Sequence, residues 1–162
     1  MASSIKNLSD FSHITVANAN PFKFGIVVAQ WNAEITGALL NGAISGLEKH
    51  GAQEENIKII EVPGSFELIT GADILLRDDS FDAIICLGCV IQGETRHFDF
   101  ICDAVANGIS NVALKYNKPV IFGVLTTDNQ QQALDRAGGK HGNKGEEAAI
   151  TAIQMAHISA QY

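Results

Sequence analysis

The chain has 162 residues, of which 46% are hydrophobic and 18% are charged. This length and composition predict one globular domain with an apolar core and exclude an intrinsically disordered chain. Eighteen acidic against eleven basic residues give a net charge of −7. This charge repels the phosphates of nucleic acids and anionic membrane surfaces, so we expect neither as a partner.

An amino-terminal arm, residues 1–21, precedes the first regular pattern, and we expect the domain to comprise residues 22–162. Residues 24–30 are continuously apolar and rich in β-branched side chains, which is typical of a strand buried on both faces of a parallel sheet. In residues 33–49 the apolar side chains recur at helical spacing, so this segment predicts a helix that follows the first strand.

Two more pairs of strand and helix follow along the chain. Residues 57–62 predict the second strand, and residues 65–76 predict the second helix, after a Pro-Gly turn at residues 63–64. Residues 83–91 form an apolar run that predicts the third strand. The third helix is predicted at residues 98–116, whose apolar side chains keep a stripe of helical spacing.

The last part of the chain predicts one more strand and two helices. Residues 119–125 are the fourth strand. Thr127, with a glutamine three residues later, gives a capping pattern for a short helix that ends near residue 137. Residues 138–145 are glycine-rich and cationic, and residues 146–159 predict a closing alanine-rich helix.

This alternation predicts an α/β fold, namely a three-layer α/β/α sandwich with a four-stranded parallel, flavodoxin-like doubly wound sheet. In open sheets of this kind, ligands bind beyond the carboxyl ends of the strands. The segments that leave the strands contain aromatic, hydroxyl, carboxylate and imidazole groups. We therefore expect a ligand with a planar polar ring and a charged tail at this edge of the sheet.

Four candidate residues follow the first two strands. Trp31, the only tryptophan, either stacks on a heteroaromatic ligand or caps the sheet as a core aromatic. Ser65 and Phe66 follow the Pro-Gly turn, where free backbone N–H groups can donate to a ligand carbonyl, and Glu67 can accept from a ligand N–H. Ordinary helix capping is the alternative for this segment.

His97, Thr95 and Arg136 are candidates for proton transfer and phosphate binding. Among the five histidines, only His97 follows a strand, so it shares the ligand-binding edge and can exchange protons near neutral pH. Arg136 with Thr95 can hold a phosphate through paired donors. The alternative for Arg136 is a solvated surface side chain.

The sequence lacks the signatures of several common sites. No G-x-G-x-x-G follows a strand, residues 138–145 lack Walker spacing, no G-x-S-x-G occurs, and no histidines stand at metal-ligand spacing. Cys86 and Cys89 lie three residues apart in a predicted strand, which places their thiols on opposite faces. We therefore expect chemistry without a metal or a redox cofactor.

Cysteine count and the amino terminus bear on the cellular compartment. Three cysteines are an odd number that does not describe a disulfide framework, and residues 1–10 do not resemble a secretion signal. No apolar run approaches the roughly twenty residues that span a bilayer. These features predict a cytoplasmic protein with reduced thiols and no membrane segment.

Several short segments together resemble the 6,7-dimethyl-8-ribityllumazine synthase family, and the resemblance covers roughly residues 22–157. They keep the family's order and spacing, which makes the combination far more specific than any one segment. The segments are residues 62–68 (VPGSFEL), 88–99 (GCVIQGETRHFD), 125–128 (LTTD), 132–138 (QALDRAG) and 142–145 (GNKG).

The resemblance implies that the chain joins 5-amino-6-ribitylaminouracil to 3,4-dihydroxy-2-butanone 4-phosphate in the penultimate step of riboflavin synthesis, without a cofactor. It implies imine formation, loss of phosphate, ring closure and dehydration, with His97 transferring protons and Trp31 stacking on the pyrimidine. The residues matched to the uracil and ribityl chain are Ser65, Phe66, Glu67, Cys89, Val90 and Ile91, those on the phosphate side are Glu94 and Thr95, and those given by a neighbouring subunit are Phe122, Arg136 and Lys144.

Three positions differ in detail from the family pattern. Trp31 stands where phenylalanine or tryptophan is usual, Gln92 where arginine is frequent, and Glu94 where a small residue is common. A carboxylate is unfavourable beside a phosphate. We therefore expect the Glu94 side chain to turn away, so that only its backbone N–H binds the ligand.

Three classes of function are compatible with the residues alone: a cofactor-independent enzyme on a phosphorylated substrate, a flavin or pterin carrier, and a shell-forming structural protein. The resemblance favours the enzyme and implies a homo-oligomer, either a pentamer or a shell of twelve pentamers. The short glycine-rich segment favours the shell, whereas Asn20 and Pro21 favour an arm that does not pair with the edge of a sheet. Both assemblies therefore stay open. Riboflavin synthase is a further candidate partner.

Overall fold

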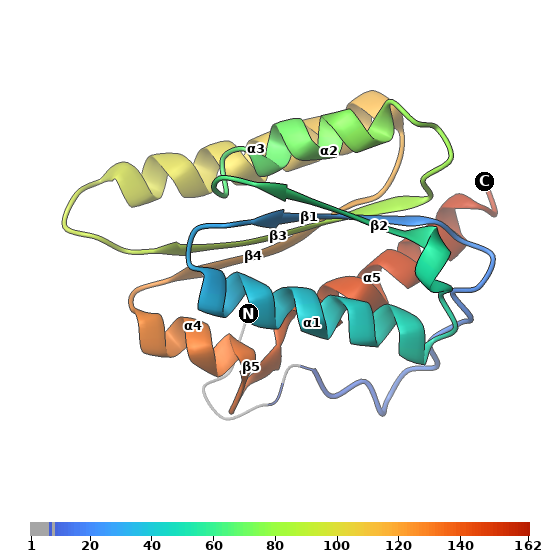
Figure 1. Cartoon of the computed structure of the whole chain (residues 1–162), viewed down its shortest axis with the longest axis horizontal. Helices are drawn as coiled ribbons and strands as arrows, with labels where there is room; N and C mark the ends of the chain where they lie inside the picture. The colour runs from blue at the N-terminus through green and yellow to red at the C-terminus, as the bar shows by residue number, and fades with distance from the viewer. Residues whose placement is uncertain (1–6, 8) are drawn as a thin grey trace.

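The central sheet has four parallel strands in the order β2-β1-β3-β4 (Figure 1). The structure is a computed structural model that describes residues 7 and 9–162. The strands of this sheet are β1 (Phe24–Ala29), β2 (Ile57–Val62), β3 (Ala83–Ile91) and β4 (Val120–Thr127). Because neighbouring strands pair in parallel, their carboxyl ends lie at one edge of the sheet.

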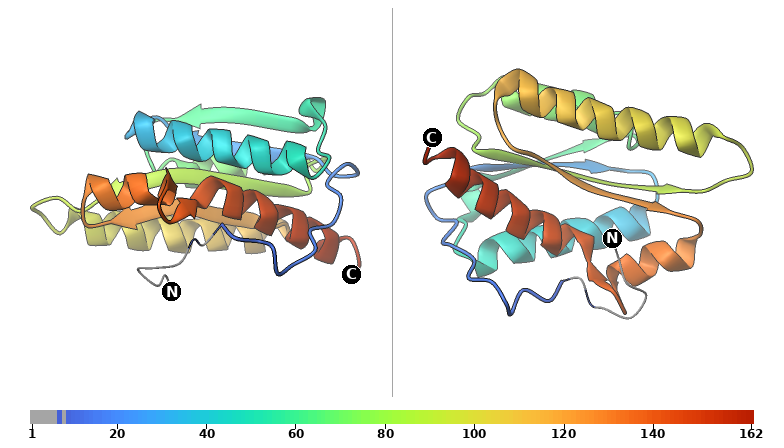
Figure 2. Two further views of the ribbon diagram at one scale, coloured as in Figure 1. Left: turned by 90° about the horizontal axis from the view of Figure 1, so that it is seen from below. Right: turned by 180° about the vertical axis from the view of Figure 1, so that it is seen from behind.

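Helices cover both faces of the sheet and complete the three layers, which confirms the predicted fold class (Figure 2). The helices on one face are α1 (Ala33–Lys49), α4 (Gln130–Arg136) and α5 (Lys144–Ser159), and those on the other are α2 (Leu68–Leu76) and α3 (His97–Tyr116). A 3₁₀ turn at Glu54–Asn56 precedes β2, and a hairpin of β5 (Ala137–Gly139) and β6 (Gly142–Asn143) connects α4 to α5. No helix in the described part of the chain is long and apolar enough to cross a membrane.

Each face of the sheet has its own apolar core, because the central strands β1 and β3 are buried on both faces. Alternate residues of β3 enter different cores, so Cys86 packs with α2 and α3, whereas Cys89 packs with α1 and α5. This confirms that the two thiols lie on opposite faces. Burial raises the pKa of Cys86 to about 12 and that of Cys89 to about 11, so both thiols stay protonated near neutral pH.

The second helix begins later than predicted. α2 starts at Leu68 rather than at residue 65, because residues 65–67 form a turn. In this turn the Glu67 N–H donates to the Gly64 carbonyl over 3.2 Å. The Glu67 carboxylate in return accepts from the Gly64 N–H over 3.0 Å, so reciprocal bonds hold the segment outside the helix.

The cap of the fourth helix also differs from the prediction. Thr127 does not cap α4, because it is the last residue of β4 and its carbonyl still accepts from the Gln92 N–H over 2.8 Å. The cap is Asn129, whose Oδ1 accepts from the Gln132 N–H over 2.9 Å. Strand pairing therefore decides where this helix begins.

The closing helix α5 begins at Lys144 rather than at residue 146. Asn143 caps it, because its Oδ1 accepts from the N–H groups of Gly145 over 2.8 Å and Glu146 over 3.4 Å. The glycine-rich segment before it contains the β5-β6 hairpin and includes Gly142 at a φ of 85°. Glycine adopts this left-handed conformation without steric cost.

Residues before β1 pack against the ends of α1 and α5. Ala19 is fully buried, and its N–H donates to the His50 carbonyl over 2.8 Å. Phe22 packs edge-on against His157 of α5, with ring centroids 4.6 Å apart. The chain therefore contributes to the core on this face before the first strand begins.

Asp73 of α2 joins the two helices on the other face. Its carboxylate accepts from the Tyr116 hydroxyl of α3 over 2.9 Å and from the Arg77 guanidinium over 2.9 Å, and it forms an ion pair with Lys115. These donors, Lys115 first, hold the pKa of the Asp73 carboxyl well below its usual range. The ionised carboxylate therefore stabilises the packing of α3 on α2.

Asp73→Asn should lower the free energy of unfolding by about 1 kcal/mol at pH 7, because a neutral amide replaces charge-assisted bonds that solvent partly screens. Since the folded pKa is depressed, this contribution is complete above the ordinary carboxyl pKa of 3.8 and is lost as the pH falls below it. Urea unfolding at pH 7 and pH 3 measures the difference. Asp103→Asn, at an exposed carboxylate of α3, is the control, and a difference that persists unchanged at pH 3 would contradict the assignment.

Candidate active site

The segments that leave the four strands lie together on the left of Figure 1. Backbone bonds connect them in pairs, since the Gln30 N–H donates to the Val62 carbonyl over 2.8 Å, as Gln92 does to Thr127. We call this region the carboxyl edge. It comprises residues 30–32, 63–67, 89–97 and 126–129.

The indole of Trp31 lies exposed at the carboxyl edge, with 68% of the residue accessible. The ring packs against Gly64, where an added Cβ would come within 2.6 Å of the indole Cε3 atom. The backbone N–H of Trp31 donates to the Pro63 carbonyl over 3.1 Å, which fixes the position from which the side chain extends. The alternative of a core aromatic is therefore wrong, and the indole is available to a ligand.

Ser65, Phe66 and Glu67 form the turn beside Trp31. The N–H groups of Ser65 and Phe66 have no acceptor within the described residues, so they can donate to a ligand. Ser65 is buried, and its hydroxyl lies over Gly88 of β3, where an added Cβ would come within 2.6 Å of Oγ. No side chain in the described structure accepts from the first N–H groups of α2, so helix capping by this segment is limited to the bond between Glu67 and the Gly64 N–H.

Asn32 connects the ends of β1 and β3, although the sequence alone did not single it out. Its backbone is left-handed, with φ 60° and ψ 47°, and its Nδ2 donates to the Cys89 carbonyl over 3.0 Å. Asparagine tolerates this conformation better than most residues, so an asparagine directly after a strand was the available signal. The bond holds Trp31 near the strand end, where Cys89 is buried and Val90 and Ile91 are half-buried.

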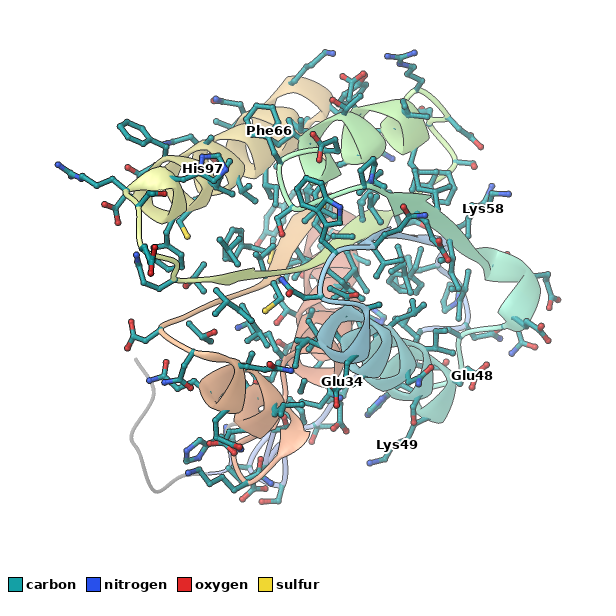
Figure 3. All side chains as sticks on the ribbon, turned by 60° about the vertical axis from the view of Figure 1, so that its left-hand side comes forward. Glu34, Glu48, Lys49, Lys58, Phe66 and His97 are labelled. Carbon is teal, nitrogen blue, oxygen red and sulfur yellow. The ribbon has the colours of Figure 1, made fainter. Side chains whose placement is uncertain are left out.

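His97 is the first residue of α3 and is exposed at the carboxyl edge (Figure 3). Its N–H donates to the Thr95 hydroxyl over 3.4 Å, and its imidazole makes no hydrogen bond within the described residues. Gln92 holds the preceding turn, because its amide donates to the carbonyls of Gly93 over 2.8 Å and Thr95 over 3.5 Å. Glu94 in this turn is exposed as well. The imidazole is therefore free to exchange protons with a ligand.

Of the three residues matched to a neighbouring subunit, the two cations lie on the face of the sheet opposite to α3, which His97 begins. Phe122 is 37% exposed on the outer strand β4, and the alternation of that strand places it on the face covered by α2 and α3. Arg136 ends α4 and Lys144 begins α5, both on the opposite face. The sheet therefore separates these two cations from His97 within one chain.

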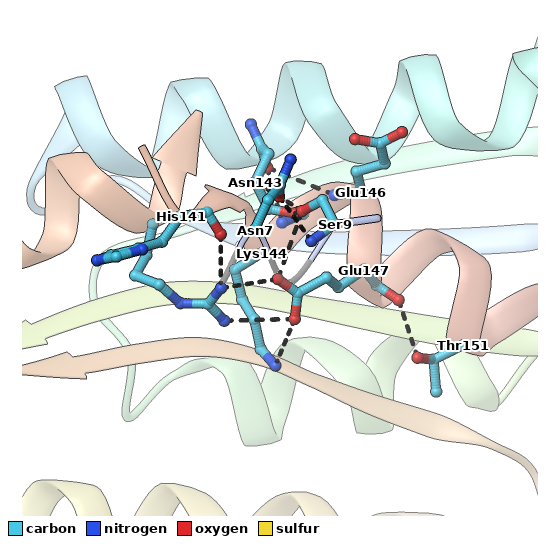
Figure 4. Close-up of polar contacts among 10 residues, drawn as sticks. Asn7, Ser9, His141, Asn143, Lys144, Glu146, Glu147 and Thr151 are labelled. Carbon is cyan, nitrogen blue, oxygen red and sulfur yellow. Dashed lines mark hydrogen bonds and ion pairs between the residues drawn. The ribbon is translucent and has the colours of Figure 1, made fainter. Parts of the chain in front are cut away.

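Arg136 and Lys144 share the carboxylate of Glu147 in the first turn of α5 (Figure 4). Nη1 and Nη2 of Arg136 donate to Oε1 and Oε2 over 2.9 and 3.3 Å, and the Lys144 Nζ lies 3.4 Å from Oε2. Nη1 also donates to the His141 carbonyl over 3.1 Å. The side chains of Arg136 and Glu147 are only 16% and 15% exposed, so the alternative of a solvated surface arginine is wrong.

Glu147 is a second residue that the sequence did not single out. Its spacing of three from Lys144 on one helix signals that pair, but no local pattern connects it to Arg136. An arginine has five N–H donors, and three of them are used here. The Nε–H and one Nη2 hydrogen have no acceptor within the described residues, so this edge of the guanidinium suits an oxyanion.

The carboxyl edge and the cluster around Glu147 differ in what they can do chemically. The carboxyl edge offers an aromatic face, backbone donors and one imidazole, whereas the cluster around Glu147 offers oriented cationic donors. Among the described residues no group of three or more His, Cys, Asp or Glu is placed to hold a metal ion. Binding of a planar ring, proton transfer and anion binding are the chemistries that these residues support.

Comparison with known proteins agrees with this chemistry. A model of the family described as 6,7-dimethyl-8-ribityllumazine synthase matches residues 21–160. The chain is 63% identical over 155 residues to the 6,7-dimethyl-8-ribityllumazine synthase of Cytophaga hutchinsonii, covering 96% of this chain and 97% of that one. It is 52% identical over 160 residues to the protein of the same name from Parabacteroides distasonis, covering 99% and 100%. The chain therefore belongs to the 6,7-dimethyl-8-ribityllumazine synthase family, as its sequence motifs predict.

Proposed function

We propose that this chain is a transferase that condenses 5-amino-6-(D-ribitylamino)uracil with 3,4-dihydroxy-2-butanone 4-phosphate to 6,7-dimethyl-8-ribityllumazine, with release of phosphate and water. This reaction is the penultimate step of riboflavin biosynthesis. The observation that carries the proposal is membership of the family over residues 21–160. The carboxyl edge supports it, because an exposed indole, free N–H groups and an exposed imidazole lie there together.

In this proposal the pyrimidine binds against Trp31. A planar heteroaromatic ring stacks favourably on an exposed indole. The N–H groups of Ser65 and Phe66 donate to the carbonyl oxygens of the ring, while Glu67 and the strand end at residues 89–91 line the ring and its ribityl chain. The support is that these N–H groups lack another acceptor within the described residues.

His97 acts as the acid and the base of the reaction. The amine of the pyrimidine adds to the ketone carbonyl, and the adduct loses water to give an imine. Loss of phosphate follows, then ring closure by the ribitylamino nitrogen on the remaining carbonyl, and a second loss of water gives the product. Each step moves a proton, and imidazole is the side chain that both donates and accepts near neutral pH. The exposure of His97 and the absence of an imidazole partner in the described part of the chain support this role.

The phosphate binds between two subunits. The turn of one subunit contributes backbone N–H groups at Glu94 and Thr95, with the Glu94 side chain directed away, and Arg136 and Lys144 of a neighbour contribute the positive charge. The separation of His97 from these cations by the sheet supports a shared site.

A shared site requires a homo-oligomer, and we propose a pentamer, with the sixty-subunit shell as a larger assembly and riboflavin synthase as a partner. The exposure of Phe122 on the outer strand supports its use by the pyrimidine of a neighbouring subunit. Cys86, Cys89 and Cys102 are unpaired, which supports a cytoplasmic location.

The purified protein, incubated with both substrates, should release phosphate and form a product with lumazine fluorescence, whereas a carrier would retain ligand without turnover. His97→Ala should lower kcat by about two orders of magnitude, the usual scale of positioned acid–base catalysis. His13→Ala is the matched control, because His13 is an exposed histidine of the arm. The reaction is refuted if the wild type forms no product, and His97 leaves the mechanism if its variant keeps a rate within about twofold.

Adding the product or riboflavin should strongly quench tryptophan emission, because stacking places the heteroaromatic ring against the sole indole, Trp31. The measurement is a fluorescence titration of the assembled protein. Trp31→Phe is the control, since it keeps an aromatic face and should retain turnover while losing the signal. Emission that stays constant at saturating ligand would argue against stacking.

Mixing two inactive variants tests the shared site. His97→Ala and Arg136→Ala chains, combined in equal amounts after dissociation and reassembly, should regain activity in about a quarter of their sites, where an intact His97 meets an intact Arg136 of its neighbour. Each variant reassembled alone is the control and should keep only its own low activity. No recovery in rings shown by mass to be mixed would mean that both residues serve one subunit.

A further inference from the structure

Ser9 of the amino-terminal arm contacts the residue that caps α5 (Figure 4). Its hydroxyl accepts from the Asn143 N–H over 2.7 Å and lies 3.1 Å from the Asn143 carbonyl oxygen, to which it can donate. The same hydroxyl lies 3.5 Å from Oε1 of Glu147. One side chain of the arm therefore binds both backbone groups of the capping residue and reaches the carboxylate that holds Arg136.

A turn and a glycine allow the arm to lie here. The Ser9 N–H donates to Oδ1 of Asn7 over 2.9 Å, which closes a turn within the arm. On the facing hairpin, a Cβ added to Gly142 would collide with Asn7 Oδ1 and Ser9 Oγ. Gly142 therefore serves this contact as well as its own left-handed backbone conformation.

Asn143 transmits the contact to α5 and to α1. Its Oδ1 accepts from the N–H groups of Gly145 and Glu146 over 2.8 and 3.4 Å, and its Nδ2 donates to the Ala38 carbonyl of α1 over 3.0 Å. The position of Asn143 therefore sets where the first turn of α5 lies. That turn carries the lysine and the glutamate of the cluster around Arg136.

We propose that Ser9 is a positioning residue for the phosphate-binding cations. Ser9 fixes Asn143, Asn143 fixes the first turn of α5, and Glu147 in that turn fixes the guanidinium of Arg136 with its free N–H edge towards the ligand. The inference rests on the proposed function, in which Arg136 and Lys144 bind the phosphate. It gives the arm a task in substrate binding.

A merely structural role for Ser9 leads to a different expectation. The core on this face consists of apolar side chains of the sheet and its helices, and Ser9 is not part of it. Loss of the hydroxyl therefore leaves the fold in place. A positioning role produces a defect specific to the phosphate, because Arg136 and Lys144 shift while Trp31 and Ser65 stay where they are.

Ser9→Ala should raise KM for the phosphorylated ketone about fivefold, the contribution of one neutral hydrogen bond, with KM for the pyrimidine unchanged. Inorganic phosphate, titrated calorimetrically into the assembled protein, should bind more weakly by a similar factor. Ser9→Thr keeps the hydroxyl and should restore both values. Ser12→Ala is the matched control, because Ser12 is an exposed serine of the same arm whose hydroxyl has no partner in the described residues.

Two results would overturn the proposal. One is a Ser9→Ala protein that matches Ser12→Ala in both KM values and in phosphate affinity. The other is a rise in both KM values together, which would indicate a general structural defect. Failure of the proposed function is seen separately, as a wild type that forms no lumazine. The phosphate titration still decides in that case, because equal affinity of wild type and Ser9→Ala, including no binding by either, contradicts positioning.

Discussion

Burial of the parallel sheet on both faces restricts polar, reactive side chains to the ends of its central strands. β1 is buried along its whole length and β3 up to its last two residues, so a polar side chain within either strand would lose its hydration without a partner. Polar groups therefore collect where the strands end, and parallel pairing brings these ends together. The same sheet keeps the helices of its two faces apart, and with them His97 and Arg136. In the proposed mechanism, oligomerisation thus follows from topology.

Hydrogen bonds between side chains and backbone hold the groups at the carboxyl edge. Asn32 holds the end of β1 to the Cys89 carbonyl, Glu67 closes the turn after β2, and Gln92 closes the turn before α3. These bonds are made within the protein itself and need no ligand. Donors that are already in place lose less freedom when the ligand binds, which favours affinity and catalysis.

Sequence predicts this fold best where one segment's own pattern decides the outcome. The apolar runs and helical stripes of β1, β3, α1 and α3 place these elements to within one residue of the structure. Errors occur at residues 65–67 and at Thr127, where hydrogen bonds of a turn or a strand decide the boundary. The contact of Ser9 with Asn143 joins residues 134 positions apart, and no periodicity encodes such a contact. The same holds for Glu147 and Arg136, which belong to different helices.

Charge limits what the cluster of Arg136, Lys144 and Glu147 can bind. The chain carries a net charge of −7, so an anion meets an unfavourable field unless a local excess of positive charge offsets it. Arg136 and Lys144 with Glu147 provide that excess, because two cations share one carboxylate. Glu147 reduces the total attraction, yet it binds the end of the guanidinium and leaves only the Nε side available. A fixed pair of parallel N–H donors matches two oxygens of one phosphate group. In the proposed function, the carboxylate thereby orients the guanidinium for an oxyanion of that geometry.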